Sequence, residues 1–94
     1  MAILSFADYE TEKIFYREFS RKLPEDIQKT ALRKLLYMDA AQNLSDLRVP
    51  PANRLEQLKG DRQGQYSIRI NEQYRICFSV SDEGFFDLEI VDYH

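Results

Sequence analysis

The sequence has only one cysteine, Cys77, and one histidine, His94, among its 94 residues. A single cysteine cannot form a disulfide within the chain, and no cluster of Cys and His has the spacing of a zinc site. These absences favour a reducing compartment, so we expect a cytoplasmic protein, and we predict no metal and no other cofactor.

Long apolar runs are also missing. The longest are a few residues, far below the roughly 20 that cross a bilayer, and the N-terminus lacks the basic region and long apolar stretch of a signal peptide. We therefore expect neither a membrane partner nor export. The chain has room for one domain, residues 1–94, and is too short for separate cofactor and substrate domains.

Positive charge is scarce. Thirteen Lys and Arg against sixteen Asp and Glu give a net charge of -3, which as a total argues against a nucleic-acid partner. The charge is unevenly distributed, however. Residues 48–76 contain six bases and three acids, whereas residues 77–94 contain five acids and no Lys or Arg. One face of the folded chain can therefore be positive, although the same pattern also fits an ordinary charged surface.

Two helices are predicted in the first half of the sequence. Residues 25–41 begin with acids and have an apolar stripe at helical spacing, formed by Ile27, Ala31, Leu35 and Met38. Residues 9–19 predict a shorter helix, with Asp8 as its N-cap and an apolar stripe of Ile14, Phe15 and Phe19. A short strand around residues 2–6 precedes it.

A period of two replaces the helical period in the second half. Pro50 and Pro51 make residues 44–52 a connecting loop, and a weak strand follows at 53–58. Residues 66–70 and 74–80 alternate as adjacent strands, and a turn at 81–84 leads to a last strand with Phe86, Leu88 and Ile90 on one face. The predicted fold is α+β, in the order β-α-α-β-β-β-β, with two N-terminal helices packed on a mainly antiparallel twisted sheet.

The strand alternation predicts a group of cations on the open face of the sheet. If Tyr74 and its alternate neighbours face the helices, then Arg75 and Arg69 point to the opposite face. Lys59, Arg62 and Tyr66 lie near the ends of these strands. Such cations can hold a phosphate, Arg by two parallel hydrogen bonds and Lys as a point charge. Pairing with an acid across the sheet is the alternative explanation for any single Arg.

Two residues are candidates for proton transfer. His94 is the last residue, and the adjacent α-carboxylate and Asp92 favour the protonated form that a general acid needs. A terminal histidine also fits a simple frayed tail. Glu56 lies between Arg54 and Lys59 and fits either a general base or an exposed surface acid.

Three long segments resemble a known family. They are NRLEQLKGDRQGQYSIRIN at residues 53–71, QYRICF at 73–78 and EIVDYH at 89–94. Together they closely resemble the HigB toxins of type II toxin–antitoxin modules, which belong to the RelE/ParE superfamily. The opening residues 5–13 and the loop 47–51 are also similar to that family, so the resemblance covers nearly the whole chain. Ala52 replaces a glycine that is common in the family after the two prolines.

The resemblance implies a fold and an activity. HigB-like toxins have the RelE-like fold and are endoribonucleases that cut mRNA codons in the A site of the 70S ribosome. The implied reaction is metal-free: the ribose 2′-OH attacks the adjacent phosphate and leaves a 2′,3′-cyclic phosphate and a 5′-OH. The implied partners are the 70S ribosome with its mRNA, and a cognate HigA-type antitoxin through which alone the toxin meets operator DNA.

The resemblance also implies roles for individual residues. Lys59 and Arg75 match positions that stabilise the scissile phosphate, and Asp92, Tyr93 and His94 match the C-terminal catalytic cluster, with His94 as general acid. Glu56 matches a position where other members have a histidine or a glutamate base. Three residues are expected to contact RNA without making bonds: Arg62, Tyr66 and Arg69. Two alternatives remain at this point, namely a ParE-like gyrase poison and a weakly active relative that serves mainly as an antitoxin-binding co-repressor.

Overall fold

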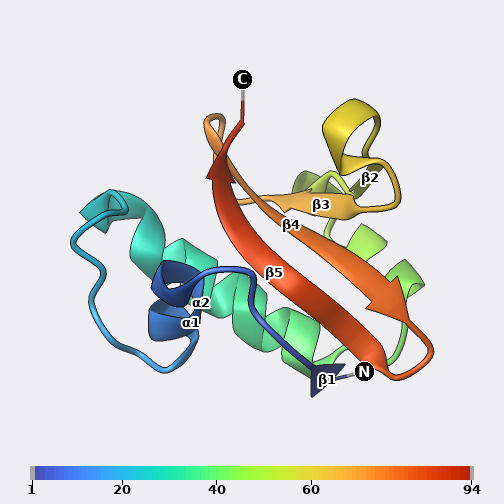
Figure 1. Ribbon diagram of the computed structural model, residues 1–94, viewed down its shortest axis with the longest axis horizontal. Coiled ribbons are helices and arrows are strands. Elements are labelled where there is room, and N and C mark those ends of the chain that lie inside the picture. The colour runs from blue at the N-terminus through green and yellow to red at the C-terminus, as the bar shows by residue number, and fades with distance from the viewer. Residues whose placement is uncertain (1, 94) are drawn as a thin grey trace.

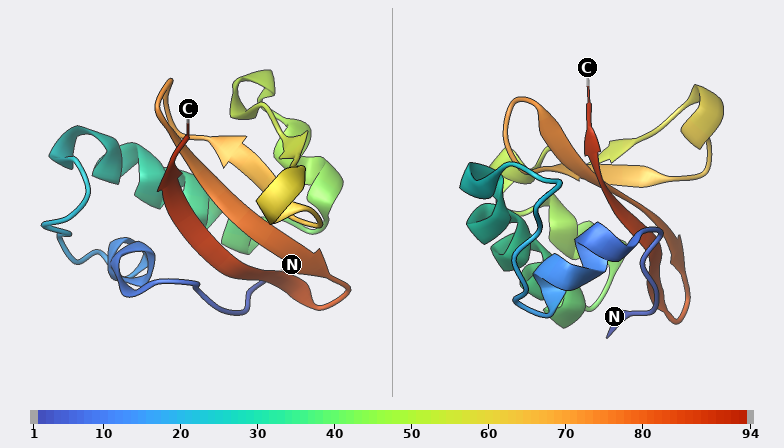
Figure 2. Two further views of the ribbon diagram at one scale, coloured as in Figure 1. Left: turned by 45° about the horizontal axis from the view of Figure 1, so that its top comes forward. Right: turned by 60° about the vertical axis from the view of Figure 1, so that its left-hand side comes forward.

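Two α-helices pack on one face of a five-stranded sheet in the computed structural model, which describes residues 2–93 (Figures 1 and 2). The elements in chain order are β1 (Ala2–Ile3), α1 (Tyr9–Phe15), α2 (Glu25–Ala40), β2 (Glu56–Gln57), β3 (Tyr66–Arg69), β4 (Tyr74–Ser81) and β5 (Gly84–Asp92). Three short 3-10 helices lie in the connections: η1 (Leu44–Arg48), η2 (Pro51–Asn53) and η3 (Gly60–Arg62). The predicted α+β order is confirmed. No helix in this part of the chain is long and apolar enough to cross a membrane.

The sheet has the order β1-β5-β4-β3-β2. β1 pairs with β5 in parallel, and the other neighbours are antiparallel, so the sheet is mainly antiparallel as predicted. β4 and β5 form the long twisted hairpin in the middle of the molecule (Figure 1). This topology brings the C-terminal end of β5 beside β4, and therefore close to the β3–β4 turn.

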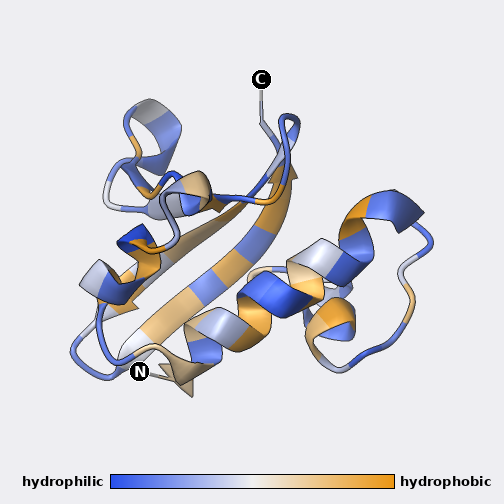
Figure 3. Cartoon of the chain, turned by 180° about the vertical axis from the view of Figure 1, so that it is seen from behind, coloured by the Kyte–Doolittle hydropathy of each residue, from blue (hydrophilic) through white to orange (hydrophobic). Residues whose placement is uncertain are grey.

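The core lies between the helices and one face of the sheet. All four residues of the predicted α2 stripe are buried, and they pack with Ile68, Ile76, Phe78 and other residues of the strands. α1 is tied to the sheet by a buried polar contact, because Thr11 Oγ1 accepts a hydrogen bond from the backbone N–H of Ile90 at 2.9 Å. Burial of the apolar stripe is the main stabilising force. Hydropathy alternates along the long strands accordingly (Figure 3).

α1 is shorter than predicted. It ends at Phe15, because Arg17 has a left-handed backbone with φ of 66°. The following turn is held by Gln28, whose amide donates to the carbonyls of Ser20 and Leu23. The prediction of Phe19 on the apolar stripe is therefore wrong, since that side chain lies beyond the helix and is 57% exposed. Asp8 occupies the N-cap position, but its side chain makes no capping hydrogen bond.

The last strand also departs from the predicted alternation. Asp87 has φ of 55°, and together with Leu88 it lies opposite the single residue Phe78, which is a β-bulge. A bulge changes which side chains point to each face. Phe85 is consequently buried with Leu88 and Ile90, whereas the sequence predicted Phe86 in that position.

The face opposite the helices is not open along its whole length, which corrects a third prediction. Arg75 points to this face, as expected, yet it is only 6% exposed, and Ser67 and Cys77 beside it are fully buried. Residues 54–62 fold back against the face, where the carbonyl of Arg54 accepts a hydrogen bond from Arg75. Arg62 forms an ion pair with Glu89 on β5 at 3.1 Å.

Candidate active site

A polar cavity of about 350 Å³ lies where the end of β5 meets the β3–β4 turn and the segment before β2. Its lining combines three cations with two carboxylates and two other polar side chains: Arg54, Glu56, Arg69, Asn71, Glu72, Arg75 and Tyr93. Arg69 and Arg75 come from opposite positions of the antiparallel pair β3–β4, which puts two like charges side by side. The cavity therefore has the character of an anion site.

Arg75 is the most firmly held of these side chains. Its Nε donates to Ser67 Oγ at 2.7 Å, and its Nη2 donates to the carbonyl oxygens of Arg54 at 2.5 Å and Ser67 at 3.3 Å. Nη1 is the remaining nitrogen and lies on the side of Glu56, 3.8 Å from Oε1, which is longer than a hydrogen bond. A buried guanidinium thus has two nitrogens fixed by the protein and one at a cavity wall.

The C-terminal residues reach the same cavity through the sheet. The backbone N–H of Tyr93 donates to the carbonyl of Gln73 at 2.6 Å, and the Gln73 amide donates to Asp92 Oδ2 at 3.0 Å. The Tyr93 ring lies 5.5 Å from the Arg75 guanidinium carbon and is 40% exposed. Asp92 therefore orients the end of β5, and Tyr93 forms a wall of the cavity. The predicted general acid His94 is the next residue and lies outside the described residues.

Glu56 lines the cavity and comes from the short strand β2. Its side chain is 48% exposed, and its only ion-pair partner within residues 2–93 is Arg75. A half-exposed carboxylate at a cavity wall is placed to accept a proton from a substrate hydroxyl. The geometry is thus compatible with both roles that the sequence allows for Glu56, a general base or an exposed surface acid.

Three other predicted residues are not part of this cavity. Lys59 precedes η3 and lines a separate hollow with Gln57, Leu58 and Gln63. Arg62 is engaged by Glu89 and by Gln65 Oε1 at 3.0 Å. Tyr66 is half-buried, and its ring stacks on Phe78 with 6.2 Å between centroids. Their roles as phosphate or RNA contacts stay predictions.

Sequence reasoning missed three lining residues, namely Arg54, Asn71 and Glu72. Arg54 follows η2 with φ of 46°, and this left-handed turn directs its carbonyl to Arg75. Asn71 shapes the β3–β4 turn, because its Oδ1 accepts from the backbone N–H groups of Gln73 and Tyr74. The position of Asn71 in a predicted turn was a usable signal, whereas the sequence contains no signal for the turn at Arg54.

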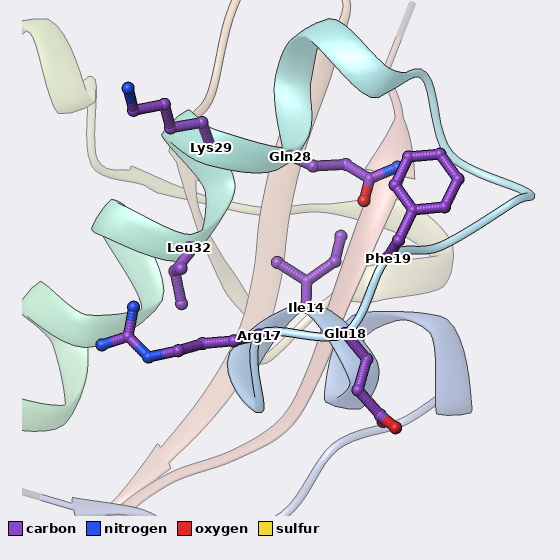
Figure 4. Close-up of a pocket in the computed structure, with 7 residues that line it drawn as sticks. All are labelled: Ile14, Arg17, Glu18, Phe19, Gln28, Lys29 and Leu32. Carbon is purple, nitrogen blue, oxygen red and sulfur yellow. The ribbon is translucent and has the colours of Figure 1, made fainter.

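A second, apolar groove of about 320 Å³ lies between the end of α1 and α2 (Figure 4). Ile14 and Leu32 form its floor, and the Phe19 ring extends from the loop over it. Arg17, Glu18 and Lys29 lie at its edges.

Two side chains have pKa values that depart clearly from the ordinary ones. Burial raises the pKa of the Cys77 thiol, with Glu89 acting in the same direction and Arg62 and Arg75 opposing it. Cys77 is therefore a neutral packing residue rather than a nucleophile. Burial, together with the positive charges of Arg33 and Arg69, lowers the pKa of Lys34. Among residues 2–93, no group of three His, Cys, Asp or Glu side chains is arranged to hold a metal ion.

The fold is shared with a chain of a solved bacterial complex. A solved structure of the YoeB–YefM complex from Staphylococcus aureus contains a chain that superposes with a TM-score of 0.53, at 22% identity. The superposition covers 100% of this chain and 97% of that one. The likeness shows that the two chains share a fold.

Sequence comparison defines the family more closely. A family model described as the RelE-like toxin of the type II toxin–antitoxin system HigB matches residues 4–94. The curated Toxin HigB-1 of Vibrio cholerae is 46% identical over 81 residues, which is 84% of each chain. An uncharacterized protein of Haemophilus influenzae is 41% identical over 75 residues, or 80% of this chain and 74% of that one. The chain belongs to the HigB-like toxins of type II toxin–antitoxin systems.

Proposed function

We propose that this HigB-like toxin is a ribosome-dependent endoribonuclease that cuts mRNA in the A site. The observation that carries the proposal is the state of Arg75: a buried guanidinium with two nitrogens held by Ser67 and Arg54, and with Nη1 at the wall of a cavity that Glu56 and Tyr93 also line. A fixed cation in a partly dehydrated site stabilises the charge that develops on a phosphate during cleavage.

The proposed reaction is a transesterification within the RNA. The 2′-oxygen of the ribose attacks the adjacent phosphorus while Glu56 accepts the hydroxyl proton, and the bond from phosphorus to the 5′-oxygen breaks. His94 protonates the departing 5′-oxygen, so the products are a 2′,3′-cyclic phosphate and a 5′-OH. Arg75 Nη1 donates to a non-bridging oxygen as charge builds up there. Lys59 contacts a phosphate from the separate hollow that it lines, and Tyr93 stacks on a base of the codon.

We further propose a HigA-type antitoxin as the partner that neutralises this activity, and contact with operator DNA only through that antitoxin. The family membership supports this part of the proposal. Because the substrate is mRNA on a 70S ribosome, the protein works in the cytoplasm.

The test is expression of the toxin with and without the neighbouring antitoxin gene, followed by primer-extension mapping of translated mRNA. We expect cuts in phase with codons, growth arrest without the antitoxin and relief of both with it. Growth arrest with intact mRNA would instead indicate a ParE-like action on gyrase. Absence of arrest would indicate a protein whose remaining role is antitoxin binding and co-repression.

A further inference from the structure

Arg69 connects the active-site cavity to a second group of cations on α2. Arg69 lines the first cavity with Arg75 and Arg54, and Asn53, the chain neighbour of Arg54, holds Lys34, on which the positive charge of Arg69 acts. Lys34 in turn lines a smaller cavity of about 160 Å³ together with Arg33, Tyr37, Pro50 and Asn53. The positive charges therefore continue from Arg75 across the end of β3 to the middle of α2.

Arg75 at one end of this row pairs with Glu56, but within residues 2–93 Arg33, Lys34 and Arg69 have no carboxylate at ion-pair distance. No carboxylate lines the smaller cavity, and the charged groups that act on Lys34 are Arg33 and Arg69, both cations. Within residues 2–93 the guanidinium groups of Arg33 and Arg69 make no hydrogen bond or ion pair, whereas Arg62 and Lys13 have carboxylate partners. Neighbouring like charges without partners destabilise a fold. The presence of three such cations in a chain of net charge -3 is therefore explained by a negatively charged ligand that binds them.

Lys34 is held in a defined place. Its ammonium donates to Oδ1 of the fully buried Asn53, whose amide donates to the carbonyls of Leu47 and Val49. Asn53 thereby fixes the connection from η1 to η2 and the lysine at the same time. The ammonium has three donors and a single protein acceptor, which leaves donors for a ligand oxygen.

We propose that Arg33, Lys34 and Arg69 form a phosphate-binding tract that holds the RNA backbone next to the nucleotide at Arg75. The inference rests on the proposed function for the identity of the ligand. An RNA strand whose scissile phosphate lies at Arg75 carries further phosphates on both sides, and a positive tract that begins at the same cavity is placed to bind them. The tract contributes to the affinity for RNA and to the position of the strand in the site, whereas Arg75 contacts the phosphate whose bond is cleaved.

The test compares variants that lose the same charge at different places. Arg33→Gln combined with Arg69→Gln removes two charges of the tract without removing a side-chain contact. Arg21→Gln combined with Lys22→Gln is the control, because both residues are exposed in the loop between α1 and α2 and their side chains make no polar contact within the described residues. Lys34→Gln keeps a donor for Asn53 and removes the charge. Thermal melting of each variant checks that it is folded.

Binding is measured as a function of salt in two arms. One uses a short RNA with a 2′-deoxy group at the cleavage position, and the other uses 70S ribosomes programmed with the same message. Each lost phosphate contact lowers the slope of log K against log salt by about 0.7 to 1. We expect the tract variant to lower the slope by roughly 1.4 to 2, and the control to leave it near the wild-type value.

The arms separate the source of the phosphate. A lower slope on the free RNA assigns the tract to the mRNA, and a lower slope only on the ribosome assigns it to ribosomal RNA; either result supports the proposal. Equal slopes for the tract and control variants in both arms would overturn it. Because binding needs no cleavage, a failure of the proposed nuclease activity is distinguishable from a failure of the tract.

Discussion

Arg75 Nε donates a hydrogen bond of 2.7 Å to Ser67 Oγ, and both side chains are buried on the same face of the sheet. The two residues come from β3 and β4 and lie close to each other across the pair. The hydroxyl fixes the plane of the guanidinium, and the carbonyl of Arg54 fixes its other side. This arrangement makes Ser67 a positioning residue for the proposed phosphate contact.

Loss of the Ser67 hydroxyl is expected to slow cleavage. A hydrogen bond to a charged group contributes about 1.5 to 3 kcal/mol, and each 1.36 kcal/mol is tenfold in rate, so Ser67→Ala is predicted to lower kcat about 10- to 100-fold. Ser67→Cys, of similar size but a poor acceptor, has the same effect, and Ser67→Thr restores activity. The measurement is the single-turnover rate on programmed ribosomes.

A double-mutant cycle separates positioning from general damage to the fold. If Ser67 acts through Arg75, Ser67→Ala has no further effect on the rate in an Arg75→Ala background. An equal loss of rate in both backgrounds would mean that the serine serves the fold alone.

Gly84 is predicted to be essential for the pairing of β1 with β5. A Cβ at this position would lie 2.1 Å from the carbonyl oxygen of Ala2, and β1 has only two residues with which to adjust. Gly84→Ala should therefore lower the free energy of unfolding by about 2 kcal/mol and Tm by roughly 10 °C. Gly60→Ala is the matched control, since Gly60 also has positive φ but has open space around its Cβ position. Equal melting temperatures of the two variants would contradict the steric argument.

Cys77 is expected to make stability fall at alkaline pH. Burial raises its pKa in the folded state, whereas in the unfolded chain a thiol ionises near pH 8.5. Above that pH the unfolded state gives up the proton and the folded state keeps it, so folding loses free energy as pH rises until the folded pKa is reached. Below pH 8 the thiol is protonated in both states, so Cys77 adds no pH dependence to the free energy of unfolding.

The measurement is the unfolding free energy of wild type and Cys77→Ala from pH 7 to pH 10. The difference in stability between the two proteins should shrink as the pH increases. A thiol reagent should also label the native protein far more slowly than the unfolded one at pH 8. A constant difference together with rapid native labelling would show that the thiol is not buried in solution.

The sequence predicted the parts of the fold that depend on periodicity. The α2 stripe and the alternation of β3 and β4 were correct, because burial of one face imposes a period of 3.6 or 2 on the residues themselves. The prediction was wrong where a single backbone angle interrupts the period. Arg17 ends α1 before Phe19, and Asp87 forms the bulge that exchanges Phe86 for Phe85, yet neither residue is a glycine that would have marked the position.

The candidate site was predicted in part for a similar reason. The direction of Arg75 followed from alternation, and the resemblance to HigB toxins assigned Glu56, Asp92 and Tyr93, which lie in or beside the cavity. The burial of Arg75 was not predictable, since it depends on a carbonyl brought back by the left-handed turn at Arg54. The cationic tract was not predictable either, because the sequence pattern places Arg33 and Lys34 on an ordinary solvent-exposed face of α2.

The most direct test of the account is the cleavage rate of the purified toxin on 70S ribosomes with a programmed A-site codon, for wild type and Arg75→Ala. We predict products with a 2′,3′-cyclic phosphate and a 5′-OH, and a rate about 100- to 1,000-fold lower for Arg75→Ala, measured at a temperature at which that variant is folded. A folded Arg75→Ala variant that cuts as fast as wild type, or a wild type that leaves the mRNA intact, would contradict the account.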